Sequence, residues 1–157
     1  MRVGIGYDSH RYADGRPLVL GGQRIPHGQG LAGHSDADAV AHAVTDALLG
    51  AAAAGSIGDL FPDTDPRWQG ADSMQLLRQA VAHIGARGWR PVQADVTVIA
   101  EAPRLASHAP AMAAELARAL GVDAGSVGVK AKTNEGMGFI GRGEGLAVIA
   151  VATVEAH

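Results

Sequence analysis

The sequence predicts an α+β fold in which a mixed β-sheet carries its helices on one face. Three observations favour this fold: strand-like segments occur at both ends of the chain, amphipathic helical segments lie between them, and glycine or proline separates the two kinds. The predicted order is three strands, two helices, a strand, a helix and two strands, which lacks the strict alternation of a parallel α/β sheet. With 157 residues, the chain is long enough for one domain, residues 1–157, and too short for two of ordinary size.

The individual elements follow from the period of the apolar residues and from the residues that interrupt it. Strands are expected at residues 2–8, at 17–26 as a short hairpin-like pair, and at 92–103, 126–135 and 145–156. Helices are expected at residues 36–54, 73–87 and 107–120, closed by Gly55, Gly88 and Gly121. Ser35 is the expected N-cap of the first helix, with Asp38 as its partner in a capping box. Residues 55–73 lack an apolar period and predict a long ordered loop.

The composition excludes several classes of protein. The net charge is −3 and the 13 lysines and arginines are scattered, so no nucleic-acid partner is expected. No signal-peptide pattern is present, and the longest run of small apolar residues, ALLGAAAAG, is too short to cross a bilayer, so we expect a cytoplasmic protein without a membrane partner. Cysteine is absent, so a transition-metal site must use His, Asp and Glu. An aromatic content of 4% and 22 glycines predict a core of small side chains, which favours oligomerisation.

Polar residues at the end of the first predicted strand and along the first predicted helix form one pattern. Because side chains alternate along a strand, Asp8 and His10 should share one face, while Ser9 should point the other way. The helix is apolar on nearly every face, and its polar residues form a single stripe: Asp38, His42, Thr45 and Asp46. The stripe has no long charged side chain, so we expect it to be buried and paired, with Asp8 and His10 as the candidate partners.

The residue types in this pattern predict a metal site. The two imidazoles and one carboxylate of Asp8, His10 and His42 leave a fourth tetrahedral position open, which is the pattern of a catalytic zinc site, with one ion per subunit. Mn²⁺ or Co²⁺ would also accept these ligands. Asp46, one turn after His42, is expected to accept the second ring N–H of that histidine. A structural Asp–His hydrogen bond or a plain helix cap, without metal, is the alternative at this point.

Two further segments carry groups suited to phosphate chemistry. The segment FPDTDP, residues 61–66, has two carboxylates and a hydroxyl, although its composition alone favours a solvated turn. The segment KTNEGMGFIGRGEG, residues 132–145, combines Lys, Thr, Glu and Arg with glycines that let backbone N–H groups approach an anion. Together with the metal site, this loop indicates a phosphorylated substrate, most simply a diphosphate.

Six segments, in order and over essentially the whole chain, resemble the 2-C-methyl-D-erythritol 2,4-cyclodiphosphate synthase family: GYDSHR, LGG…IPHGQGLAGHSDADAVAHAVTDALLGA, IGDLFPDTDP, GADS, AEAP and KTNEGMGFIGRGEG. The resemblance implies a homotrimer with its sheets around a central axis, its helices outside, and active sites between adjacent subunits. It also implies a cyclising phosphorus–oxygen lyase of non-mevalonate isoprenoid biosynthesis. Such an enzyme converts 4-diphosphocytidyl-2-C-methyl-D-erythritol 2-phosphate to the 2,4-cyclodiphosphate and releases CMP.

The resemblance assigns roles to individual residues. Asp8, His10 and His42 match zinc ligands, and Glu135 matches a ligand of a second ion, Mg²⁺ or Mn²⁺, on the substrate diphosphate. His34 and Thr133 match positions that stabilise the transition state, as hydrogen-bond donors to phosphate oxygens. The expected substrate contacts, which include a cytidine-diphosphate pocket from the adjacent subunit, are Asp8, Ser9, His10, His34, Ser35, Ser56, Ile57, Gly58, Phe61, Pro62, Asp63, Thr64, Asp65, Ala100, Glu101, Ala102, Pro103, Arg104, Leu105, Ala106, Lys132, Thr133, Asn134, Glu135, Phe139 and Arg142.

The chain departs from the family pattern at two of these positions. Ser56 stands where the family usually has Asp, and its shorter reach puts the affinity for the sugar in doubt. Glu101 replaces a more usual Gln, which should be tolerated because cytosine is read there mainly by backbone groups. Phe139 and Arg142 are retained and look toward the trimer axis, where some relatives bind an isoprenoid diphosphate; whether this chain does so stays open.

Two other functions are alternatives to the cyclising lyase, and each predicts a different observation. A generic metal-dependent phosphohydrolase of a nucleoside diphosphate conjugate would use the same Asp and His ligands, but it would give an acyclic phosphate. An inactive trimeric protein that binds metal or isoprenoid would predict a broken metal triad, whereas Asp8, His10 and His42 are all present.

Overall fold

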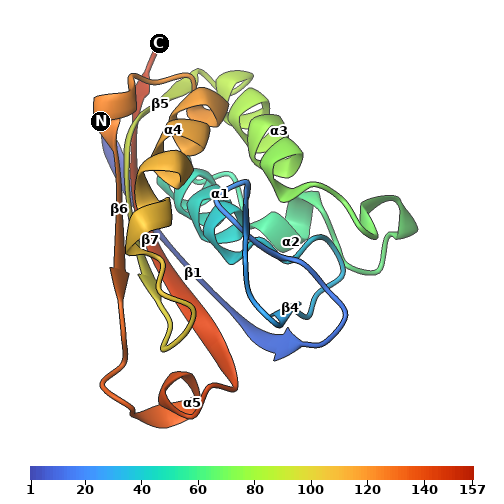
Figure 1. The fold of residues 1–157 in the computed structure, drawn as a ribbon. Coiled ribbons are helices and arrows are strands. Elements are labelled where there is room, and N and C mark those ends of the chain that lie inside the picture. Colours follow the sequence, from blue (N-terminus) through green and yellow to red (C-terminus); the bar gives the residue numbers. More distant parts are fainter.

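The computed structural model describes all residues, Met1–His157. Helices cover one face of a sheet, and a smaller lobe of strands and loops lies beside them (Figure 1). The strands are β1 (Arg2–Ala13), β2 (Leu18–Leu20), β3 (Gln23–Ile25), β4 (Gly30–Leu31), β5 (Trp89–Ile99), β6 (Val127–Lys132) and β7 (Gly145–Ala156). The α-helices are α1 (Ala39–Ala51), α2 (Ile57–Leu60), α3 (Ser73–Gly85), α4 (Ala109–Leu120) and α5 (Gly138–Gly141), with short 3₁₀ turns η1 (Pro66–Trp68), η2 (Ala106–His108) and η3 (Ala124–Ser126).

The main sheet is mixed, as the sequence predicts. Its strand order is β4-β1-β7-β5-β6, and β2 pairs with β3 in a separate hairpin. Strands β5 and β6 are parallel because the chain between them crosses over through α4. The other neighbours in the sheet, β1 with β4 and β7, and β5 with β7, are antiparallel.

The core lies between the sheet and the layer of α1, α3 and α4, which Figure 1 shows on the same side of β7. Alternate residues of β7 point into this core, namely Leu146, Val148, Ala150, Ala152 and Val154. Leu48, Leu77 and Leu116 contribute to the same core from the three helices, and all three are fully buried. No helix is both long enough and apolar enough to cross a membrane.

The other face of the sheet is apolar and uncovered in a single chain. Val3, Ile5 and Tyr7 on β1 expose 66%, 69% and 56% of their surface, and Ile149 and Val151 on β7 expose 37% and 38%. Ile5 pairs with Val151 and Tyr7 with Ile149 across the two strands, so these five side chains form one continuous patch, which we call the open face. Exposed apolar patches of this kind mark surfaces for association.

The first long helix begins later than the sequence predicts. It starts at Ala39 with Asp38 as its N-cap, so the assignment of the cap to Ser35 was wrong. The Asp38 carboxylate accepts hydrogen bonds from the backbone N–H groups of Ala41, Gly21 and Gly22, which ties the β2–β3 turn to the helix. Burial raises the pKa of Asp38 to about 6, although the three N–H donors oppose that rise.

Other boundaries also differ from the prediction. Strand β1 runs to Ala13 because its last residues pair with β4 and β7. The expected loop at 55–73 contains α2 and η1, each too short to show an apolar period. Strand β5 begins at Trp89 and ends at Ile99, whereas 92–103 was expected. The glycine-rich segment before β7 contains the single turn α5.

Helix α1 lies unusually close to β1, and glycines make this approach possible. A Cβ built on Gly6 would lie 1.9 Å from the carbonyl oxygen of Ala43, and one on Gly4 would lie 2.2 Å from that of Ala47. No Cβ fits at such distances, and backbone atoms cannot rotate away as a side chain can. Gly4 and Gly6 therefore allow the helix to pack directly on the strand backbone.

We predict that Gly6→Ala lowers the free energy of unfolding by at least about 2 kcal/mol, because the added methyl group must push α1 away from β1. Gly85→Ala, at the end of α3, is the matched control, since a Cβ there meets no atom within 4 Å. It should leave stability unchanged or slightly raised. Urea denaturation followed by circular dichroism measures both variants, and equal stabilities for the two would contradict this account of the packing.

Candidate active site

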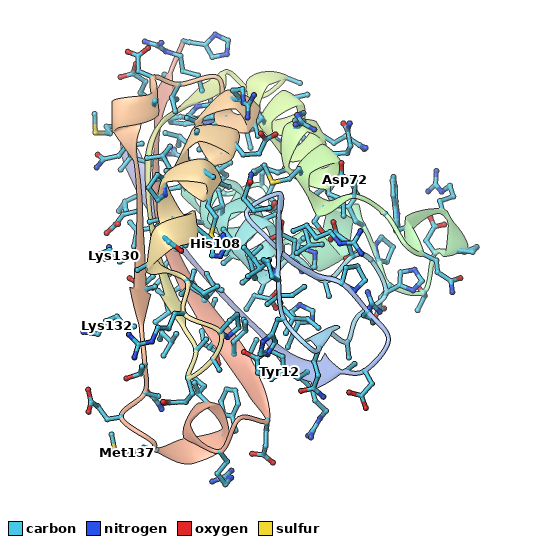
Figure 2. All side chains as sticks on the ribbon, viewed as in Figure 1. Tyr12, Asp72, His108, Lys130, Lys132 and Met137 are labelled. Carbon is cyan, nitrogen blue, oxygen red and sulfur yellow. The ribbon has the colours of Figure 1, made fainter.

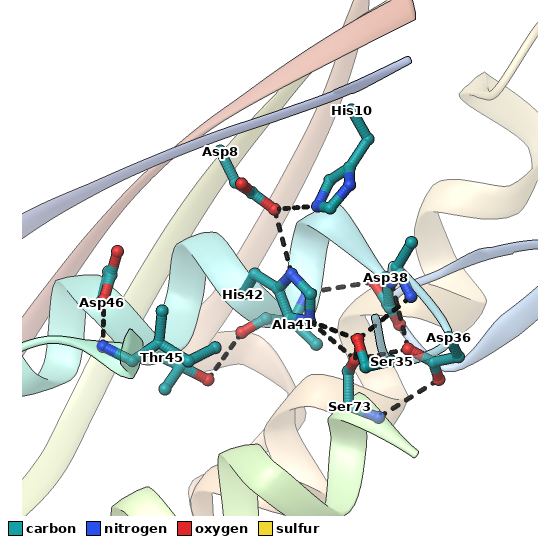
Figure 3. Close-up of polar contacts among 12 residues, drawn as sticks. Asp8, His10, Ser35, Asp36, Asp38, Ala41, His42, Thr45, Asp46 and Ser73 are labelled. Carbon is teal, nitrogen blue, oxygen red and sulfur yellow. Dashed lines mark hydrogen bonds and ion pairs between the residues drawn. The ribbon is translucent and has the colours of Figure 1, made fainter. Parts of the chain in front are cut away.

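Asp8, His10 and His42 converge where β1 meets α1. Oδ2 of Asp8 lies 2.7 Å from Nε2 of His10 and 3.1 Å from Nδ1 of His42 (Figure 3). Even-numbered residues of β1 face the helices and odd-numbered ones face away, so the predicted alternation is confirmed. The predicted pairing of the helix stripe with the strand is confirmed for His42, which reaches Asp8 because α1 packs so closely on β1.

The hydrogen bonds around His10 point to a cation between these three groups. Nδ1 of His10 lies 2.7 Å from the carbonyl oxygen of Ala32, which can only accept, so Nδ1 carries the hydrogen. In the neutral ring, Nε2 then has only a lone pair, and it faces a carboxylate oxygen of Asp8. Two lone pairs at this distance require a proton or a metal ion between them.

The charges of the group fit such a cation. Burial disfavours the charged form of Asp8, but the rings of His10 and His42, which can donate to Asp8 when they are protonated, outweigh burial and hold the pKa of Asp8 below its ordinary value. Burial likewise acts to lower the pKa of His10, yet the hydrogen bond with Asp8 leaves that pKa raised. One ligand atom from each of the three residues lies within 4.8 Å of the others, so the donor set fits a divalent metal ion.

A cavity of about 550 Å³ opens beside this triad. Most of its lining was expected from the sequence, and Gly33, Trp68 and Leu76 are additions: the lining residues are His10, Gly33, His34, Ser35, His42, Ile57, Gly58, Phe61, Pro62, Asp63, Thr64, Trp68 and Leu76. The ring of Trp68 packs edge-on against Phe61, with centroids 5.1 Å apart. Sequence reasoning missed Trp68 because it lies beyond the recognisable motif, on η1.

The loop that carries His34 is held in place at several points. Arg16 donates hydrogen bonds to the carbonyl oxygens of Gly33 and Ser35, both at 2.7 Å. Nε2 of His34 donates to the carbonyl oxygen of Asp65 at 3.1 Å, which joins this loop to the segment after α2. The loop of His34 is therefore held by Arg16 on one side and by the segment after α2 on the other. No hydrogen bond joins the His34 side chain to the triad.

Two residues expected at the sugar turn toward neighbouring side chains. The Ser56 hydroxyl and backbone N–H both donate to Asp59 at 2.8 Å, which caps the short helix α2. Ser56 does not line the cavity, whereas Ile57 and Gly58 do. The Asp65 carboxylate is engaged with Arg67, whose guanidinium holds the pKa of Asp65 below its ordinary value.

The residues expected around a cytidine diphosphate border a second hollow, of about 340 Å³. Its lining residues, at the end of β5 and along β6, are Ala100, Glu101, Pro103, Arg104, Leu105, Ala106, Ala131, Lys132 and Thr133. Lys132 lies on the edge strand β6 (Figure 2). In the same view, α2 lies on the other side of the molecule (Figure 1). Within one chain, the two hollows are thus separate and have no lining residue in common.

Glu101 organises the loop that follows β6. Its Oε1 accepts hydrogen bonds from the backbone N–H groups of Asn134 and Gly136, at 2.9 and 3.2 Å. Between them lies Glu135, which has a left-handed backbone with φ of 53° and is fixed further by a bond from its N–H to Oγ1 of Thr133. In the sequence, Glu101 stood out only as a departure from Gln. In the structure, its side-chain oxygen holds the two backbone N–H groups on either side of Glu135.

The remaining expected residues lie apart from the triad. Glu135 is exposed and does not join Asp8, His10 and His42 within this chain. Ser9 lies on the opposite face of β1 from Asp8, beside a small hollow that it shares with Phe139. Arg142 pairs with Glu144 at 2.9 Å near the same end of the sheet. The carbonyl oxygen of Ala102 accepts a hydrogen bond from Tyr12.

The expected contact between Asp46 and His42 was wrong. The Asp46 carboxylate accepts the backbone N–H of Ile57 at 2.7 Å and so positions the start of α2. Nε2 of His42 instead faces Ser73 at 2.8 Å and Ser35 at 3.2 Å. Sequence reasoning missed Ser73 because it belongs to α3, whose position over α1 depends on the tertiary fold.

An α+β fold in which one carboxylate and two imidazoles converge beside a cavity is the arrangement of an enzyme with a candidate metal centre. The YgbB family model matches residues 1–155, and the chain therefore belongs to the YgbB family. A curated relative from Dechloromonas aromatica (strain RCB), named 2-C-methyl-D-erythritol 2,4-cyclodiphosphate synthase, is 60% identical over 154 residues, which are 98% of this chain and 96% of the relative. A relative of the same name from Bordetella petrii is 60% identical over 151 residues, 96% of this chain and 93% of its own.

Two solved structures of the same kind of enzyme also resemble this chain. A 2C-methyl-D-erythritol-2,4-cyclodiphosphate synthase in a CDP-bound form superposes with a TM-score of 0.89 at 42% identity, over 98% of this chain and all of that one. The bifunctional IspDF from Campylobacter jejuni gives a TM-score of 0.95 at 42% identity, and this chain spans 42% of that longer protein. The resemblance found in the sequence is thereby confirmed.

We predict that Glu101→Ala frees the loop that carries Thr133 and Glu135. Hydrogen exchange of the Asn134 and Gly136 amides, followed by NMR, should quicken about fivefold, which corresponds to the loss of about 1 kcal/mol. Glu101→Gln is the matched control: its amide oxygen can accept both bonds, so exchange should stay near that of the native chain. Equal exchange in Glu101→Ala and in the native chain would contradict the role assigned to this carboxylate.

Proposed function

We propose that the protein converts 4-diphosphocytidyl-2-C-methyl-D-erythritol 2-phosphate to 2-C-methyl-D-erythritol 2,4-cyclodiphosphate and CMP. The observation that carries the proposal is the convergence of Asp8, His10 and His42 at the edge of a cavity. Relatives 60% identical to this chain are named for this activity. The reaction belongs to the non-mevalonate route to isoprenoid precursors.

The chemistry needs no protein nucleophile. An oxygen of the 2-phosphate attacks the β-phosphorus in line, the bond from that phosphorus to the CMP oxygen breaks, and CMP leaves with the electron pair. Asp8, His10 and His42 would hold Zn²⁺, with Mn²⁺ or Co²⁺ as substitutes, and Glu135 would contribute to Mg²⁺ or Mn²⁺ on the diphosphate. When bound, these ions supply positive charge that polarises phosphoryl oxygens.

The chain's own groups orient the substrate and balance its charge. His34 and Thr133 are proposed to donate hydrogen bonds to phosphate oxygens as negative charge moves between them; losing one such donor typically costs on the order of 10²–10³ in rate. The cavity lined by Ile57, Gly58 and Phe61 is proposed to hold the methylerythritol. The hollow with Lys132 is proposed to take the cytidine diphosphate.

We further propose that three chains assemble with their open faces turned toward a common axis. Two observations support a trimer: the open face is apolar and uncovered, and the two hollows proposed for one substrate are separate within one chain. Packing of the sheets around an axis would bury Ile5 and Tyr7 against other subunits. It would also bring the nucleotide hollow of one subunit to the triad of the next.

The rival enzyme, a metal-dependent phosphohydrolase, would use the same triad. Incubation of the native protein with the substrate and a divalent metal, followed by ³¹P NMR, separates the two reactions. Cyclisation gives a cyclic diphosphate together with CMP, whereas hydrolysis gives an acyclic phosphate. We expect the cyclic product; an acyclic product alone would overturn the proposal.

His42→Ala should remove both the metal and the activity, because only two ligands would remain at the site. We expect about one zinc per native subunit by elemental analysis, and for the variant less than about 1% of native CMP release. His83→Ala, on α3, is the matched control and should keep both properties, since the only side-chain hydrogen bond of His83 is with Arg87. Native rates of CMP release by His42→Ala would rule out the assigned site.

Ile5→Lys tests the assembly. We expect the native protein to show by light scattering three times the 16.0 kDa of one chain, and the variant to dissociate, because a buried ammonium ion at the axis has no partner. Ala82→Lys places the same side chain on an exposed position of α3 and should leave the mass unchanged. A native protein of single-chain mass would contradict the trimer.

A further inference from the structure

A chain of partly buried hydrogen bonds continues from His42 away from the cavity. Nε2 of His42 lies 2.8 Å from Oγ of Ser73, and the Ser73 hydroxyl is hydrogen-bonded to Oδ1 of Asp36 (Figure 3). Asp36 is anchored in turn by two backbone N–H groups, from Ser73 to Oδ2 and from Asp38 to Oδ1, both at 3.1 Å. We call Asp36, Ser73 and His42 the relay.

The hydrogen atoms in the relay can be assigned from the chemistry of its members. The Asp36 oxygens accept backbone N–H groups, and a carboxylate only accepts, so the single hydroxyl hydrogen of Ser73 goes to Asp36. A lone pair of Ser73 is then left to face His42, and Nε2 of His42 must carry a hydrogen. Nδ1 is thereby free to present its lone pair toward Asp8, 3.1 Å away.

The burial of the neighbouring hydroxyl groups supports this assignment of the hydrogen atoms. Ser73 is fully buried, and Ser35, the other hydroxyl near Nε2, is 8% exposed. Water therefore cannot replace a missing partner without cost, and an unpaired buried N–H destabilises by about 1–3 kcal/mol. The ring of His42 has little freedom to flip, because a flipped ring would turn a carbon toward Ser73 or Asp8.

The fold builds the relay from three separate segments. Asp36 lies in the loop before α1, where its N–H donates to the carbonyl oxygen of Ala71 at 3.0 Å. Ser73 is the first residue of α3, and the Asp72 side chain caps that helix. Helix α3 therefore reaches the triad through the Ser73 hydroxyl.

We propose that Ser73, supported by Asp36, is a positioning residue that sets the orientation and tautomer of His42 for binding a divalent cation. The inference rests on the metal site of the proposed function and adds to it two residues outside the ligand set. Outer partners of metal-binding histidines typically change metal affinity about 10- to 100-fold when they are removed.

Zinc affinity, measured by competition with a chromophoric chelator, tests the proposal without any measurement of turnover. We expect Ser73→Ala to bind zinc about 10- to 100-fold more weakly than the native protein. Ser35→Ala is the matched control, because it deletes a hydroxyl that lies farther from the same ring nitrogen, at 3.2 Å, and that is hydrogen-bonded to Ser73 at 3.3 Å rather than to Asp36. Its affinity should change by less than about threefold. Equal losses in the two variants would overturn the relay.

A spectroscopic measurement distinguishes positioning from general loss of structure. In zinc-loaded protein labelled with ¹⁵N-histidine, the Nε2–H signal of His42 should be sharp and slow to exchange with water in the native chain. In Ser73→Ala the same signal should exchange at least about tenfold faster, as expected when its buried acceptor is lost. Unchanged zinc affinity and an unchanged Nε2–H signal would exclude the proposed role.

Asp36→Asn provides a second test if Ser73→Ala does not fold. An amide must turn its own N–H toward one of the two backbone N–H groups that Asp36 now accepts, so the relay would be weakened while the shape of the side chain is kept. We expect zinc affinity at least about threefold below that of the native protein, and native affinity would refute the relay. Weaker zinc binding in a protein that lacks cyclase activity would support the relay while rejecting the proposed function.

Discussion

The direct packing of α1 on β1 is the constraint on which the rest of the molecule depends. Gly4 and Gly6 have no side chain between strand and helix, and the backbone of Ala43 and Ala47 occupies that space. The same approach brings His42 on the helix within 3.1 Å of Asp8 on the strand. A helix held at the usual distance by larger side chains would leave the three groups of the triad too far apart to share one cation. The close packing and the convergence of the triad are therefore consequences of one contact.

The polar groups buried by this packing each have a defined partner, and together they connect distant segments. Asp38 joins the β2–β3 turn to α1, Asp46 joins α1 to α2, and the relay joins α3 to His42. Buried polar groups without partners would destabilise the fold, so these pairings specify where each element sits. Of the four short polar residues in the α1 stripe, Asp38 and Asp46 bond to neighbouring segments, and Thr45 donates to the carbonyl oxygen of Ala41 in its own helix. His42 alone belongs to the triad.

Much of the candidate site could be predicted from the sequence, because its parts follow local rules. Strand alternation placed Asp8 and His10 on one face, and helical spacing selected His42. Ser73 and Trp68 could not be found in this way, since they approach the triad and the cavity only through the positions of α3 and η1. The expected bond from Asp46 to His42 failed for a related reason: residues one turn apart are near each other, but the N–H of Ile57 competes for the same carboxylate.

The sequence by itself determined the fold class, the main elements, the family and the triad, because these depend on period, residue chemistry and motif order. Only the tertiary structure decided which partner each buried polar group takes. It moved the helix cap from Ser35 to Asp38 because Gly21 and Gly22 point their N–H groups at the Asp38 carboxylate. The tertiary structure also decided that the two hollows are separate within one chain and that the open face is exposed. Both features depend on how strands far apart in the sequence lie side by side in the sheet.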